Sequence, residues 1–139
     1  MITSIFMGFL TLLYIRITLY VIAKRKQYQV LYGPGENSQI AGAIASHSNF
    51  VAYVPILILL MYFVEVVGKA PGWLVIPFGL AIFIGRCLHF QGLKENDEQL
   101  SQQRELILKK RIMGMKLTIF SMIGLSILAI VLPIKELFF

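Results

Sequence analysis

The sequence has little charge for its length, and this limits the solvent in which it can fold. Only 14% of its 139 residues are charged, against 58% that are apolar, and its mean hydropathy is +0.77. Soluble domains carry about 25% charged and about 45–50% apolar residues. A chain this apolar cannot present a water-solvated surface, so we expect lipid to be its solvent.

Cysteine and histidine are also scarce. The single cysteine, Cys87, excludes an intrachain disulfide and a cysteine-based metal cluster, and the two histidines lie in different apolar segments. The sequence shows no glycine-rich phosphate loop, no Ser/His/Asp set and no pair of carboxylates within an apolar segment. We therefore expect neither a metal site nor a soluble-enzyme site of these kinds.

Four apolar segments are each long enough to cross a bilayer as a helix. A hydrocarbon core of about 30 Å needs about 20 helical residues, and lipid offers no partner for an unpaired backbone amide. The segments do not alternate as the strands of a membrane barrel do. We predict an all-α integral membrane protein, a four-transmembrane-helix bundle in one domain over residues 1–139. The predicted spans are residues 2–23, 40–67, 73–93 and 112–132.

Three connections separate the spans. The first carries the turn signal Gly33-Pro34-Gly35. The second, residues 68–72, is short enough for a tight hairpin, so the second and third spans must be antiparallel neighbours. The third, residues 94–111, is polar and helix-forming, with Glu105 four residues before Lys109. We expect this third connection to extend the fourth helix beyond the membrane.

The basic residues predict the orientation of the chain. Three of them lie in the first connection and five in the third, whereas the hairpin and the C-terminal tail hold one each. Positively charged loops stay in the cytoplasm. We therefore expect both termini outside and both charged connections in the cytoplasm, at the inner or plasma membrane if the organism is bacterial. The same asymmetry accounts for the net charge of +6 without a nucleic-acid partner.

Polar side chains within the spans lie at one expected depth. Arg16 and Arg86 each stand seven residues before the inner end of their span, which is about 10 Å inside the membrane edge. His47 and Asn49 lie near the start of the second span, and Lys116 near the start of the fourth. Ionisable groups in lipid are costly and tend to mark function. One hypothesis is a cationic pocket, open to the cytoplasm, in which an anionic ligand meets a lipophilic one.

A second interpretation gives these residues separate structural tasks. Lys116 and Arg16 would extend to the headgroups, and Asn49 would make an interhelical hydrogen bond. The spacing indicates which of these residues share a helix face. Asn49 shares one with Tyr53, four residues later, and Arg86 shares one with His89, three residues later. The residues alone leave both interpretations open.

Three motifs, in order along the chain, resemble one family. Residues 21–30, with Lys-Arg-Lys at their centre, look like the basic end of that family's first helix. Asn49, Tyr53 and Pro55 match its second-helix signature, and residues 85–92, ending in Phe-Gln-Gly, look like the end of its third helix. The sequence thus resembles the membrane-associated proteins in eicosanoid and glutathione metabolism, the MAPEG family, which includes microsomal glutathione transferases.

The resemblance implies a homotrimer that binds glutathione, its co-substrate, between neighbouring subunits near the cytoplasmic face. By position, Arg25 and His47 would contact the glutathione carboxylates. The residues carried over as contacts to the glutathione backbone are Asn49, Tyr53, Arg86 and His89. Arg111 resembles the family's catalytic arginine, which would lower the thiol pKa by offering a positive charge to the thiolate. Lys110 and Arg104 are further candidates for that role.

The chain departs from the family pattern at charged positions. Ala45 stands where the second-helix signature has Arg, Ala52 stands where it has Glu, and Leu93 replaces an expected aromatic. Each lost charge-assisted contact is worth about 1.5–3 kcal/mol, unless Lys26, His47 or the third connection substitutes for it. We expect a glutathione-dependent transferase or peroxidase that acts on lipophilic electrophiles at the cytoplasmic leaflet. The alternative is a non-catalytic family member that binds a lipid or a partner protein, so whether the chain is an enzyme stays open.

A third possibility comes from another class, the small four-helix drug exporters. Those transporters rely on a carboxylate embedded in the first helix. Here the first span holds Arg16. Glu65, the acid within a span, lies at the outer end of the second span. The sequence therefore disfavours proton-coupled export.

Overall fold

The computed structural model describes residues 1–94 and 97–138, with the side chains of residues 1–93 and 104–135. It consists of α1 (Ile2–Tyr28), α2 (Ser38–Tyr62), α3 (Gly72–Lys94) and α4 (Asp97–Phe138), with a π-helical turn, η1 (Phe63–Val67), that continues α2. Each of the four long helices contains a segment long and apolar enough to cross a membrane. Over the described residues, the prediction of four helices long and apolar enough to span a membrane is confirmed.

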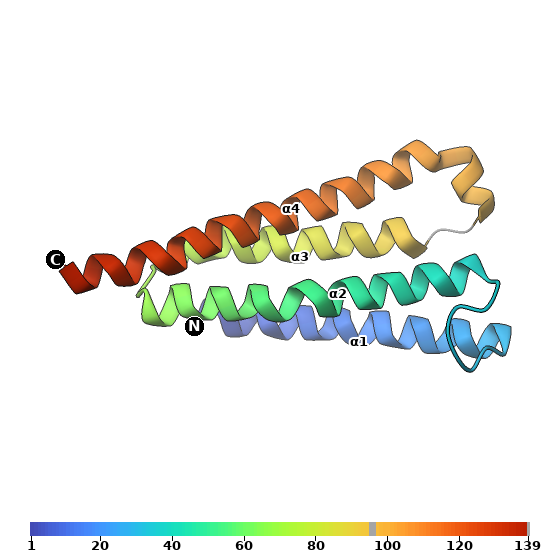
Figure 1. Cartoon of the computed structure of the whole chain (residues 1–139), viewed down its shortest axis with the longest axis horizontal. Coiled ribbons are helices and arrows are strands. Elements are labelled where there is room, and N and C mark those ends of the chain that lie inside the picture. The colour runs from blue at the N-terminus through green and yellow to red at the C-terminus, as the bar shows by residue number, and fades with distance from the viewer. Residues whose placement is uncertain (95–96, 139) are drawn as a thin grey trace.

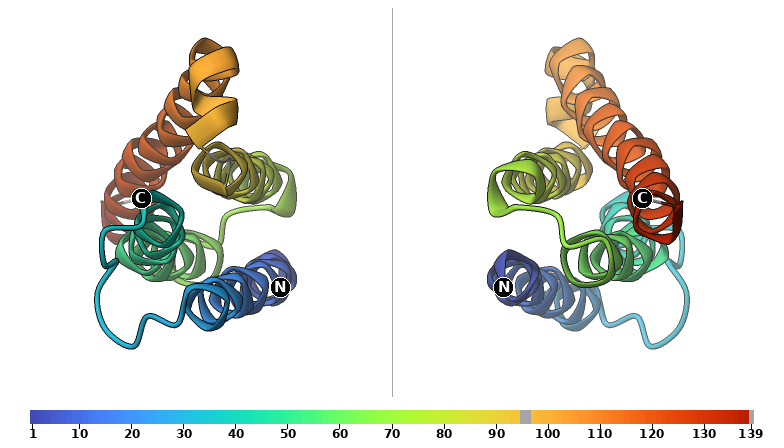
Figure 2. Two further views of the ribbon diagram at one scale, coloured as in Figure 1. Left: turned by 90° about the vertical axis from the view of Figure 1, so that its right-hand side faces the viewer. Right: turned by 90° about the vertical axis from the view of Figure 1, so that its left-hand side faces the viewer.

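The helices run up and down beside one another. α2 packs against all three other helices, and α3 packs against α1 and α4 as well. Figure 1 shows α4 crossing the others at an angle and extending past the end of α3, and the end-on views of Figure 2 show the same inclination. Both termini lie at one end of the bundle, and the α1–α2 loop and the start of α4 lie at the other (Figure 1). The two basic regions of the chain therefore share one end.

The first connection is shorter than predicted because both flanking helices are longer. α1 continues five residues past its predicted end, to Tyr28, and so includes the basic cluster. Gly33 and Gly35 adopt positive φ angles of 57° and 59° in the loop, where glycine has no side chain to clash. Asn37 then caps α2, since its Oδ1 accepts the backbone N–H of Ile40 at 3.1 Å.

The α2–α3 hairpin brings Glu65 to the first turn of α1. Glu65 lies in the π-helical turn η1, and its carboxylate accepts the backbone N–H groups of Ile2 and, at 2.7 Å, of Thr3. The first N–H groups of a helix have no partner within the helix, and its N-terminus carries a partial positive charge. Glu65 therefore caps α1 across the bundle, a role that the sequence-based predictions did not include.

The polar third connection is helical over its described part, as predicted. α4 begins at Asp97, well before its membrane-spanning segment, and runs on without a break. Glu105 and Lys109, one helical turn apart, form an exposed ion pair at 2.8 Å. Such pairs add a few tenths of a kcal/mol to the stability of a helix that projects into water.

A pair of glycines lets α3 and α4 approach closely. A methyl group on Gly114 would lie 2.6 Å from the carbonyl oxygen of Gly85 and 2.9 Å from the backbone nitrogen of His89. Small residues allow the backbones of membrane helices to come together in this way. The contact sets the Arg86–His89 turn of α3 directly against α4.

Candidate functional site

The interior of the bundle holds a buried guanidinium group. Arg86 on α3 is only 2% exposed. Its Nη1 donates to Oδ1 of Asn49 on α2 at 2.5 Å, and its Nη2 donates to Oγ1 of Thr118 on α4. Nη2 also lies 3.7 Å from Sδ of Met115, and the guanidinium carbon lies 5.7 Å from the ring centre of Tyr53. We call these five residues the Arg86 cluster, and it joins α2, α3 and α4.

The cluster surrounds the charge of Arg86 with neutral groups. Among the described side chains, no carboxylate forms an ion pair with Arg86, and its Nε has no hydrogen-bond partner. A buried charge is costly unless it is paired and fully hydrogen-bonded. The cluster therefore keeps an excess of positive charge and donor groups that an anionic oxygen would satisfy.

A groove of about 470 Å³ lies beside the cluster, along α4. The residues that line it are His89, Leu108, Arg111, Ile112, Met115, Lys116, Ile119 and Phe120. We call it the α4 groove. Its described lining carries two exposed basic side chains and a buried histidine, with no acidic residue. Arg111 and Lys116 alternate with apolar lining residues along α4, and the lining ends in Ile119 and Phe120 toward the C-terminal end of that helix.

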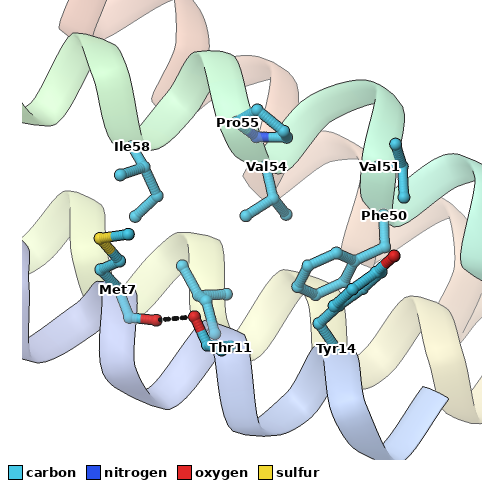
Figure 3. A pocket seen from close by; sticks show the side chains of 9 residues that line it. Met7, Thr11, Tyr14, Phe50, Val51, Val54, Pro55 and Ile58 are labelled. Atoms are coloured by element: carbon cyan, nitrogen blue, oxygen red, sulfur yellow. Dashed lines mark hydrogen bonds between the residues drawn. The ribbon is translucent and has the colours of Figure 1, made fainter. Parts of the chain in front are cut away.

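A second groove, of about 430 Å³, lies between α1 and α2 (Figure 3). We call it the α1/α2 groove, and its walls are mostly apolar. The Thr11 hydroxyl donates to the carbonyl of Met7 at 2.8 Å, as Figure 3 shows, and so turns its polar atom onto its own helix. The rings of Tyr14 and Phe50 stack at 5.5 Å between centres. Such a lining suits an acyl chain or another lipophilic group.

The structure brings several of the predicted site residues together. Asn49, Tyr53 and Arg86 belong to the Arg86 cluster. His89 is 7% exposed and lines the α4 groove together with Arg111. Of the candidates for the catalytic arginine, only Arg111 lines this groove, whereas the exposed Arg104 and the half-buried Lys110 lie outside its lining.

Other predicted residues lie apart from this centre. His47 packs on the ring of Tyr14, with 5.1 Å between ring centres. Nη1 of Arg25 donates to two carbonyl oxygens of the first loop, those of Leu31 and Gly33, each at 3.2 Å. The Arg25 side chain thus holds the α1–α2 loop against the end of α1. Lys26 is exposed at the same end of α1.

The polar layer predicted from depth divides into separate groups. Arg86 and Asn49 meet inside the bundle, and Lys116 faces the α4 groove, but Arg16 is exposed on the surface of α1. Equal depth places residues at one level of the membrane, but it does not determine the direction in which each side chain points from its helix. The interhelical hydrogen bond of Asn49 is as the structural interpretation predicted, and Arg16 lies apart from the other polar groups, so the layer is not one shared pocket.

Two residues of the cluster were absent from the sequence-based site. Met115 and Thr118 follow Arg111 by four and seven residues, a spacing that places all three on one helix face. Being uncharged, they carried no signal of their own within an apolar helix. Two of the three departures from the family pattern, Ala45 and Ala52, are exposed on α2.

The model of the MAPEG family matches residues 3–131. Inner membrane protein YecN of Escherichia coli K12 is 37% identical over 92 residues, which cover 66% of this chain and 70% of YecN, and YecN of E. coli O6:H1 strain CFT073 matches equally well. No solved structure matches at a significant level. With four apolar helices and an inner-membrane relative, this chain is an integral, multi-pass membrane protein, and it belongs to the MAPEG family.

Proposed function

We propose that this protein is a glutathione-dependent transferase that acts on lipophilic electrophiles at the cytoplasmic leaflet. The observation that carries the proposal is the α4 groove, in which Arg111, Lys116 and His89 line one cleft beside the buried Arg86. Glutathione carries two carboxylates and one amine, so a cleft lined by cations complements it. Membership of a family named for glutathione metabolism supports the same chemistry.

The proposed reaction is a thiol substitution. The glutathione thiol gives its proton to water, its sulfur forms a bond to the electrophilic carbon, and the leaving group departs with the electrons of the broken bond. Arg111 would favour the thiolate because a nearby positive charge stabilises the ionised form. The exposed position of Arg111 in the groove supports this role.

The lipophilic substrate needs an apolar surface, which the α1/α2 groove offers. The two grooves share no lining residue. The homotrimer implied by the family is part of our proposal, because an assembly would let a groove of one subunit meet the other groove of its neighbour. Sedimentation of the detergent-solubilised protein should give three times the chain mass of 15.8 kDa after correction for bound detergent. A monomer mass would count against this part.

The proposal also places both termini outside and the basic end of the bundle in the cytoplasm. Its support is the sequence, which concentrates Lys and Arg at the end of α1 and in the first part of α4, two segments that Figure 1 shows at the same end of the bundle. In a Cys87→Ser background, a membrane-impermeant maleimide added to intact cells should label Lys69→Cys, at the α2–α3 hairpin. It should label Gly35→Cys only after lysis. The reverse pattern would overturn the orientation.

Conjugation of glutathione to an aryl halide, followed in detergent, tests the activity. Arg111→Ala should lower kcat by about 100-fold, the usual cost of losing one group that stabilises a developing anion. Arg104→Ala is the matched control, because Arg104 is exposed on the same helix but does not line the groove. No conjugation by the native chain would refute the transferase, and equal loss in both variants would refute the role of Arg111.

The alternative is a non-catalytic member of the family that binds a lipid or a partner protein. Two observations favour it: Ala45 and Ala52 present no charge on α2, and Arg86 already bonds to Asn49 and Thr118 of its own chain. Calorimetry in detergent distinguishes the two. Co-purified lipid together with no heat of binding at millimolar glutathione would favour the alternative.

A further inference from the structure

The side chain of Met115 belongs both to the Arg86 cluster and to the lining of the α4 groove. Its sulfur lies 3.8 Å from Nδ2 of Asn49 and 3.7 Å from Nη2 of Arg86. A thioether is a weak hydrogen-bond acceptor, whereas an amide and above all a guanidinium are good donors. Two strong donors, one of them charged and buried, are thus directed at a poor acceptor on the wall of an open groove.

The Met115 side chain has the freedom to leave this position. Methionine is unbranched and turns about three bonds, and a groove of about 470 Å³ lies on its other side. Moving the sulfur away gives up two weak bonds. A carboxylate oxygen in its place would gain charge-assisted bonds from the same donors, which are roughly twice as strong as neutral ones.

We propose that Met115 is a displaceable gate, and that the ligand which opens it carries a carboxylate whose oxygens replace the Met115 sulfur on Arg86 and Asn49. The inference rests on the proposed function only for the source of the carboxylate, because the proposed function takes that source to be glutathione. A fatty acid offers the same group, and its chain would follow the groove toward Phe120.

Two substitutions with opposite expected effects test the gate. Met115→Ala removes the cover, so the affinity for a carboxylate should rise by about tenfold. Met115→Gln places a strong acceptor of similar length against the same donors, so the affinity should fall by about tenfold. Met113→Ala is the control, because Met113 is exposed on the same helix and lies outside the groove lining. Equal effects of the two Met115 variants, or none beyond the control, would overturn the proposal.

A labelling experiment tests the gate without any ligand. An arylglyoxal reagent modifies accessible guanidinium groups, and peptide mass spectrometry separates Arg86 from the exposed Arg111. Relative to Arg111, labelling of Arg86 should be several-fold faster in Met115→Ala than in the native chain, and slower in Met115→Gln. The same rate in all three proteins would show that Met115 does not cover Arg86.

Protection from this labelling identifies the ligand. S-Methylglutathione, which has no free thiol to consume the reagent, and decanoate are the two carboxylate probes, and decanol is the neutral control. Protection by either carboxylate, but not by decanol, supports the gate. Protection by decanoate alone supports the gate while contradicting the glutathione-dependent function. Equal protection by decanol, or none by either carboxylate in Met115→Ala, would overturn the carboxylate assignment.

Discussion

The hydrogen bond between Asn49 and Arg86 gives the most direct test of the interior of the bundle. Asn49→Ala removes the oxygen that lies 2.5 Å from Nη1 of Arg86, a side chain that is 2% exposed. The guanidinium keeps Thr118 and the weakly accepting Met115 as partners. The variant therefore leaves a buried charge less well solvated, and we expect the protein to be destabilised.

The size of the effect follows from the environment of the bond. A hydrogen bond to a charged group is worth about 1.5–3 kcal/mol in soluble proteins. Interhelical hydrogen bonds in a membrane protein average about 0.6 kcal/mol, with a maximum of about 1.7 kcal/mol. Because Arg86 is charged and lacks an ion pair among the described residues, we expect a value near the upper end, about 1.5 kcal/mol.

Reversible unfolding in mixed micelles, with increasing dodecyl sulfate, measures this free energy. Ser48→Ala, an exposed neighbour on α2, should change it by less than about 0.5 kcal/mol. A double-mutant cycle of Asn49→Ala with Arg86→Met then isolates the pair, and the coupling energy should lie between about 1 and 2 kcal/mol. A coupling energy below about 0.3 kcal/mol would refute the bond as a stabilising contact.

Two further predictions concern helix packing and capping. Gly114→Ala should lower the free energy of unfolding by about 1–3 kcal/mol, because its methyl group would lie 2.6 Å from the carbonyl oxygen of Gly85. Gly8→Ala, where an added methyl group meets nothing within 4 Å, should be neutral or stabilising, and a similar loss in both would contradict the close approach. Glu65→Gln should cost about 1 kcal/mol and speed hydrogen exchange in the first turn of α1, since that turn loses its carboxylate cap. Glu105→Gln, which breaks only an exposed ion pair, should cost at most about 0.5 kcal/mol and leave that turn unchanged.

Much of the candidate site was predicted from sequence, though not its arrangement. Spacing paired Asn49 with Tyr53 and Arg86 with His89, and the structure places Asn49, Tyr53 and Arg86 in one cluster. Thr118 gave no signal, because a hydroxyl in an apolar helix most often bonds to its own backbone. Thr118 does so too, donating to the carbonyl of Gly114 at 2.9 Å while it accepts from Arg86.

The sequence by itself determined the four spans, their order and the position of the turns. Hydrophobic length, Gly-Pro-Gly and the short hairpin are local properties, and they act the same way in any tertiary arrangement. Only the tertiary structure decided which polar residues meet. Arg16 and Arg86 have the same expected depth, yet one is exposed and the other is buried against Asn49. The rotation of each helix about its axis depends on packing, such as the contact of Gly85 with Gly114, and composition at a given depth does not encode it.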